Sequence, residues 1–154
     1  ATPTADHLVP RVGDLGLRPP VVVARETPIA QAARIMRANE ISALVVGSPG
    51  ELVSIVTERD LTRAVAEAVP LDTHAAAIAS TDVMIVTPDT TVMDVATTML
   101  REGVRHLVVV HAGRAVGVVS IRDALAALVR TVTPDTVFVM LEHLRVDPPE
   151  LWLG

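Results

Sequence analysis

Cysteine, lysine and tyrosine are absent from this chain, and phenylalanine and tryptophan occur once each, as Phe138 and Trp152. Without cysteine there is no disulfide framework, no thiolate nucleophile and no cysteine-based zinc site. Without lysine there is no Schiff-base chemistry and no phosphate-loop or Ser-Lys site. The 13 basic residues are therefore all arginines. Any bound anion must be held by locally placed arginines and by backbone N–H groups.

The composition also excludes two classes of partner. A net charge of −5 and so few aromatic rings do not suit nucleic acid, whose binding proteins present a basic face and stacking aromatics. Apolar runs such as 107–110 and 124–129 fall far below the roughly 20 residues of a membrane helix. No charged-then-apolar signal segment opens the sequence. We therefore expect a soluble, cytoplasmic protein that binds neither nucleic acid nor a membrane.

Patterns typical of catalysis and metal binding are also missing. The five histidines are scattered, without a His-x-x-x-His or His-Glu-x-x-His spacing. Neither a Gly-x-Ser-x-Gly elbow nor a Gly-x-Gly-x-x-Gly loop occurs. We therefore expect no enzymatic activity and no metal site. The route left for Mg²⁺ is a bound nucleotide, because this ion prefers phosphate together with one or two carboxylates.

The sequence contains an internal duplication. When it is shifted by 63 positions, residues 21–67 align with 84–130 without a gap, and 13 of the 47 pairs are identical. Chance would not keep this register for so long, so the chain is a tandem repeat.

Each copy has the pattern strand, helix, strand, strand, helix. Branched residues at 21–23 are typical of a strand, and the apolar runs around GSPGE and HAGR predict two hairpins. Further helices are expected from 58 to about 67 and from 121 to about 130. The linker between the copies predicts a short helix with Asp72 and Thr73 as capping candidates. The first helix of each copy is predicted by i, i+3, i+4, i+7 spacing at Ile29, Ala32, Ala33 and Met36, and at Val92, Val95, Ala96 and Met99.

A short motif opens the second helix of each copy, as TERDL at 57–61 and SIRDA at 120–124. Thr-x-x-Asp and Ser-x-x-Asp fit a capping box, in which the hydroxyl caps a backbone N–H and the acid lies near the positive helix end. The same groups suit a ligand, because a carboxylate accepts from two vicinal hydroxyls and a helix N-terminus attracts phosphate. Both interpretations stay open, and both can hold at once.

The order of elements and the two motifs resemble the cystathionine-β-synthase (CBS) domain, and the tandem resembles a Bateman module. The resemblance covers residues 12 to 130 and implies an α/β fold of two β-α-β-β-α repeats related by a pseudo-twofold axis. VGDL at 12–15 is the expected leading segment of the first repeat. We divide the chain into an N-terminal tail (1–11), repeat 1 (12–70), repeat 2 (71–132) and a C-terminal amphipathic helix and tail (133–154).

The resemblance implies a regulatory module that binds AMP, ADP, ATP or S-adenosylmethionine in clefts between the repeats, and that forms a homodimer. The regulated protein is unknown. The alternative is an interaction scaffold that dimerises and binds no ligand.

The family's site residues transfer onto matching positions. Asp60 and Asp123 would hold ribose, and Thr57 and Ser120 would support ribose or phosphate. Arg59 and Arg122 would either reach a bound phosphate or remain solvated side chains on the first turn of their helices. The base would be held by residues of the opposite repeat: Val21 and Ile41 against Asp123, and Met84 and Val104 against Asp60.

The two predicted sites differ in their basic residues. Adjacent basic residues precede the third strand of many nucleotide-binding relatives, and Arg105 and His106 stand there in repeat 2. Repeat 1 has Ser42 and Ala43 at these positions. We therefore predict that the site at Ser120 and Asp123 is the better one. The alternative is a solvated Arg105 and a histidine satisfied at a strand edge.

The motif VTPDT, which occurs at 86–90, occurs again in the C-terminal segment at 132–136. Apolar helical spacing follows at Val137, Met140, Leu141 and Leu144. We predict an amphipathic helix that docks, with Trp152, on the module or on a partner subunit. The alternative is an effector contact.

Overall fold

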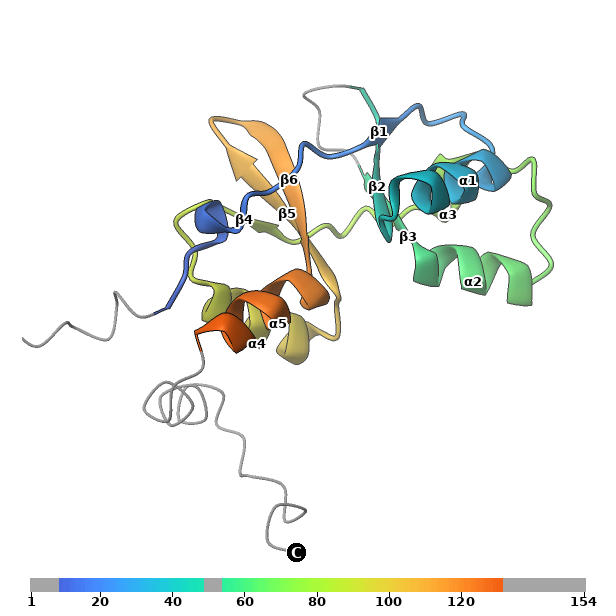
Figure 1. The fold of residues 1–154 in the computed structure, drawn as a ribbon. Helices are drawn as coiled ribbons and strands as arrows, with labels where there is room; N and C mark the ends of the chain where they lie inside the picture. Colours follow the sequence, from blue (N-terminus) through green and yellow to red (C-terminus); the bar gives the residue numbers. More distant parts are fainter. Residues whose placement is uncertain (1–8, 49–53, 132–154) are drawn as a thin grey trace, which may run out of the picture. The chain divides into compact units, whose positions relative to one another are not determined.

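The computed structural model describes residues 9–48 and 54–131, and Figure 1 shows its fold. The described part contains two three-stranded sheets, ordered β1-β2-β3 and β4-β5-β6. Both repeats therefore have the predicted order of strand, helix, strand, strand, helix. The elements are a 3-10 helix at Val12–Leu15, β1 (Val22–Val23), α1 (Ile29–Asn39), β2 (Ala43–Val46), β3 (Ser54–Thr57), α2 (Glu58–Ala66), α3 (Ala75–Ile78), β4 (Ile85–Val86), α4 (Val92–Glu102), β5 (His106–His111), β6 (Arg114–Ser120) and α5 (Ile121–Arg130).

The chain divides into two compact units that do not follow the repeats. One comprises Leu17–Ile85 and Val108–Val118, and we call it the α1/α2 unit. The other comprises Ala1–Gly16, Val86–Leu107 and Val119–Gly154, and we call it the α4/α5 unit. In the described residues, no helix is both long enough and apolar enough to span a membrane.

The sheet of the α1/α2 unit buries both of its faces. β2 pairs in parallel with β1 and antiparallel with β3, with Leu44 opposite Val56 and Ala43 opposite Thr57. All four residues of β2 are buried, as expected for a strand covered on both sides. The two sides belong to two apolar clusters, because neighbouring side chains of a strand point to opposite faces. One cluster contains Val23, Ala32, Met36, Leu44, Val46, Val56 and Ala75, and the other contains Ala43, Ile55 and Val108.

The α4/α5 unit is built around its two helices, which pack against each other. The predicted apolar face of α4 is buried in full, and Met93 is buried beside it. The predicted helix α1 has a narrower buried face, because Ile29, Ala32 and Met36 are buried whereas Ala33, which shares their spacing, is exposed. Ala33 lies at the margin of the face that α1 turns to its sheet, so a small side chain stays outside the core.

The segment that leads into each repeat packs on the other repeat, with matching hydrogen bonds. The N–H of Val12 donates to the carbonyl of Thr90, and the N–H of Ala75 donates to the carbonyl of Thr27, at positions 63 residues apart. Val12 and Ala75 are both completely buried. The duplication therefore extends to the leading segments, although few of their residues match in sequence.

This arrangement explains where the predicted caps were wrong. The N-cap of α3 is His74, not Asp72 or Thr73, and no side chain caps this helix. The carbonyl of Thr73 accepts the N–H of Ile29 instead, so backbone groups of the leading segment and of α1 satisfy each other. Residues 1–8, residues 49–53, which include part of the predicted GSPGE turn, and the predicted C-terminal helix lie outside the described residues.

Candidate functional site

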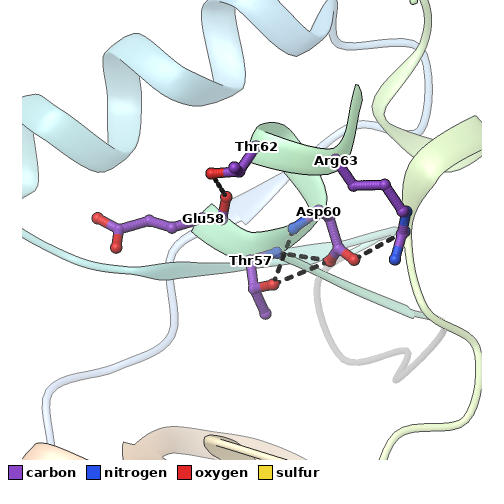
Figure 2. Close-up of polar contacts among 5 residues, drawn as sticks. All are labelled: Thr57, Glu58, Asp60, Thr62 and Arg63. Carbon is purple, nitrogen blue, oxygen red and sulfur yellow. Dashed lines mark hydrogen bonds and ion pairs between the residues drawn. The ribbon is translucent and has the colours of Figure 1, made fainter. Parts of the chain in front are cut away.

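The α2 helix begins with a complete capping box, which Figure 2 shows. The hydroxyl of Thr57 accepts the N–H of Asp60 at 3.3 Å. The Oδ2 atom of Asp60 accepts the backbone N–H of Thr57 at 2.9 Å and the Thr57 hydroxyl at 3.1 Å. The motif of repeat 1 therefore caps its helix, as one of the two interpretations predicted.

The α5 helix begins in the same way. The hydroxyl of Ser120 accepts the N–H of Asp123 at 3.1 Å. The Oδ2 atom of Asp123 accepts the N–H and the hydroxyl of Ser120, each at 2.9 Å. In both motifs one carboxylate oxygen is committed to the cap, so Oδ1 is the oxygen left for a further partner.

The two Oδ1 atoms have different surroundings. Asp60 is 7% exposed, and its Oδ1 lies 3.0 Å from Nη2 of Arg63. Asp123 is exposed, and the position equivalent to Arg63 is Ala126, which has no polar side chain. Within residues 9–48 and 54–131, no hydrogen bond or ion pair reaches Oδ1 of Asp123. In this part of the chain, the acid of repeat 2 is exposed and only its Oδ2 has a hydrogen-bond partner.

Arg105 lies directly beside the start of α5. Its carbonyl accepts the N–H of Ile121, the first residue of that helix, at 2.9 Å. In repeat 1 the carbonyl of Ser42 accepts the N–H of Glu58 at 3.0 Å in the same way. Arg105 is exposed, and the half-buried His106 follows it as the first residue of β5. The backbone of an arginine therefore lies at the start of α5, where repeat 1 has a serine.

The remaining arginines of the motifs are solvent-facing. Arg59 and Arg122 both lie in the first turn of their helices and are exposed. Such side chains contribute little to stability. Their exposure leaves them able to reach a bound anion.

The four residues predicted to hold a base are all half-buried. Val21 and Ile41 pack against the core cluster that contains Leu44. The carbonyl of Met84 accepts the N–H of Val108, and the N–H of Val104 donates to the carbonyl of Met99. The pairing of Val21 and Ile41 with Asp123, and of Met84 and Val104 with Asp60, stays a prediction.

Arg63 is the residue that sequence reasoning missed. A signal for it existed, because the aligned pair Arg63 and Ala126 differs at the position one helical turn after an identical aspartate. No group of three or more histidine, aspartate or glutamate side chains placed to hold a metal ion occurs in the described residues.

Comparison with known proteins agrees with the duplication. The sequence matches the family model of the CBS domain twice, over residues 12–67 and 75–130. An uncharacterized 17.7 kDa protein of Acidianus ambivalens is 38% identical over 109 residues, which are 70% of this chain and 66% of that protein. An uncharacterized protein of Methanocaldococcus jannaschii is 36% identical over 90 residues, 58% of this chain and 32% of that protein. The chain thus spans less than two thirds of these relatives.

Several solved structures are similar over most of this chain. A CBS-domain protein of Agrobacterium tumefaciens has a TM-score of 0.72 and 32% identity, and covers 76% of this chain and 98% of its own. A CBS-domain protein of Pyrobaculum aerophilum complexed with AMP has a TM-score of 0.71 and 32% identity, with coverages of 86% and 98%. The CBS domain pair of protein MJ0100, in complex with 5′-methylthioadenosine and S-adenosyl-L-methionine, has a TM-score of 0.73 and 25% identity, with coverages of 80% and 99%.

Proposed function

Because the chain belongs to the CBS-domain family and carries two copies of the domain in tandem, we propose that it is a non-catalytic regulatory module that binds an adenosyl compound at the start of α5. The observation that carries this proposal is the exposed Asp123 in the first turn of α5, whose Oδ1 has no partner among the described residues, together with the exposed Arg105. Similar proteins solved with AMP, 5′-methylthioadenosine and S-adenosylmethionine support the adenosyl class.

The ribose is recognised through Asp123. Its Oδ2 stays with the cap, and its Oδ1 accepts a ribose hydroxyl, which is a neutral donor that an ionised carboxylate binds well. The cap fixes the side chain before the ligand arrives, so little rotamer freedom is lost on binding. The same contacts therefore stabilise the helix and orient the binding group.

A phosphate is held at the positive end of α5. The first-turn N–H groups of a helix and its dipole attract anions. Arg105 adds a full charge there, and Arg122 is exposed in the same turn. His106 follows Arg105 and completes the set carried over from the family. This combination favours AMP, ADP or ATP over an adenosyl compound without phosphate, and any Mg²⁺ would come with the nucleotide.

Regulation requires that binding favours one association state over another. We propose that the module forms a homodimer and that the bound nucleotide changes how the dimer, or a partner protein, associates. The alternative function, a ligand-free scaffold, is favoured by one observation: the two capping boxes alone give both aspartates a structural role.

Titration calorimetry with AMP, ADP and ATP tests the proposed site. We expect about one equivalent per chain, and Asp123→Ala should weaken binding at least about tenfold, because hydrogen bonds to a charged group contribute about 1.5–3 kcal/mol. Asp60→Ala is the matched control, because it removes the same cap from the other repeat. Equal losses from the two substitutions contradict the assignment to α5.

A further inference from the structure

The aspartates of the two motifs differ in one contact, and this contact lies where a ligand would bind. Resting on the proposed function, we propose that Arg63 is a specificity-determining residue that occupies the ribose-binding oxygen of Asp60 and so suppresses adenosyl binding in repeat 1. Figure 2 shows Arg63 reaching back along α2 to this carboxylate.

The cap leaves a single carboxylate oxygen for other partners in each repeat. Oδ2 accepts two hydrogen bonds within the motif at both helix starts. At α2, Nη2 of Arg63 lies 3.0 Å from Oδ1 and takes that remaining oxygen. A ribose hydroxyl, which is a neutral donor, must therefore displace the charged guanidinium of Arg63 from Oδ1. Charge-assisted hydrogen bonds are stronger than hydrogen bonds from neutral donors.

The burial of Asp60 limits how many donors can reach its carboxylate at once. Asp60 is 7% exposed, so its carboxylate has little surface from which to receive a second donor. The Arg63 side chain is 54% exposed, so it lies over the carboxylate from the solvent side. Residues three apart on a helix are neighbours, and the guanidinium is thus tethered next to Oδ1 at no cost in translational freedom.

Repeat 2 shows the same motif without this arginine. Ala126 stands at the equivalent position, one turn after Asp123, and it is exposed. An arginine and an alanine are both good helix formers, and positions 63 and 126 both lie on helix surfaces. Exchanging the two residues therefore changes the carboxylate's partner while leaving the core and the helices intact.

The exchange is made in the full chain and read by calorimetry with AMP. Arg63 is 54% exposed, so solvent screens its pairing with the buried Asp60, and we assign the pair about 1 kcal/mol, which corresponds to about fivefold in affinity. In an Asp123→Ala background, which isolates repeat 1, Arg63→Ala should strengthen AMP binding about fivefold, and a further Asp60→Ala should abolish the gain. In the otherwise unchanged chain, Ala126→Arg should weaken binding at α5 about fivefold.

Two substitutions on α1 serve as matched controls. Arg34→Ala and Ala38→Arg make the same changes of size and charge at exposed positions that belong to neither motif, and they should leave AMP affinity unchanged. Thermal unfolding of every variant checks that the fold is retained.

The outcomes separate this inference from the proposed function. Unchanged or weaker AMP binding after Arg63→Ala, or no binding to the Arg63→Ala/Asp123→Ala chain at millimolar AMP, overturns the role of Arg63. Unchanged binding after Ala126→Arg overturns it as well. An Asp123→Ala chain that binds AMP as tightly as the original overturns the proposed site at α5 instead, whatever Arg63 does.

Discussion

Asp60 and Asp123 occupy the same position of the two capping motifs but differ in what surrounds them. Both accept the same hydrogen bonds from their own helix caps, and only Asp60 is buried and paired with an arginine. The sequence predicted the equivalence of these residues and the cap, because both depend on local spacing. It did not reveal the occupied oxygen, because that depends on the direction of one long side chain three residues on.

Arg105 is the residue expected to separate phosphate binding from ribose binding. Replacing it by serine, the residue at the equivalent position of repeat 1, removes the charge and keeps the backbone carbonyl that accepts from Ile121. We expect Arg105→Ser to weaken AMP about tenfold, because a charge-assisted hydrogen bond is lost. Adenosine, which has no phosphate, should bind within about twofold of its original affinity.

Calorimetry with AMP and adenosine side by side measures both effects. Raising the salt concentration should weaken AMP binding to the original chain more than to Arg105→Ser, because exposed charges are screened. If adenosine loses as much affinity as AMP, Arg105 supports the site structurally and does not contact phosphate.

At the scale of elements, apolar runs predicted the strands, and helical spacing and the capping motifs predicted the main helices. Val22 to Val23, the hairpin strands and these helices lie close to the predicted positions. The packing of the leading segments did not follow from such patterns, because Val12 and Ala75 are buried through contacts with residues far away along the chain. Few residues match between these segments, so their equivalence depends on backbone hydrogen bonds that sequence letters do not record.

The outer face of α5 differs from that of α2 in a way that bears on association. Leu125 and Val129 are 59% and 60% exposed, and the equivalent residues of α2 are Thr62 and Ala66. Leu100 of α4 is 63% exposed, where α1 has Arg37. Apolar side chains gathered on the helices of one repeat are typical of a surface that another chain covers. We expect a second copy of this chain to cover it.

The dimer prediction is tested by light scattering. The original chain should have the mass of two copies, and Leu125→Glu with Val129→Glu should shift the mass toward one copy, because two buried carboxylates would lack partners. Thr62→Glu with Ala66→Glu places the same charges on α2 and should leave the dimer intact. An original chain with the mass of a single copy contradicts the prediction.

At the scale of the whole molecule, the duplication provides two similar repeats that can serve different functions. Repeat 2 has Arg105, an exposed Asp123 and the exposed Leu100, Leu125 and Val129, whereas repeat 1 has Ser42, a buried Asp60 paired with Arg63, and the exposed Val65 on α2. Ligand binding and association would then be concentrated on the same repeat, because the proposed nucleotide site and the predicted contact with a second chain both involve α5.

The measurement that tests the central claim most directly is thermal unfolding of the full chain with AMP, ADP, ATP and S-adenosylmethionine. A ligand at 100 times its dissociation constant stabilises the folded state by about 2.7 kcal/mol, which raises the midpoint of a chain of this size by about 5 to 10 °C. We predict such a rise for at least one nucleotide, and its loss in Asp123→Ala but not in Asp60→Ala. No rise with any of the four compounds contradicts the sensing function and favours the ligand-free scaffold.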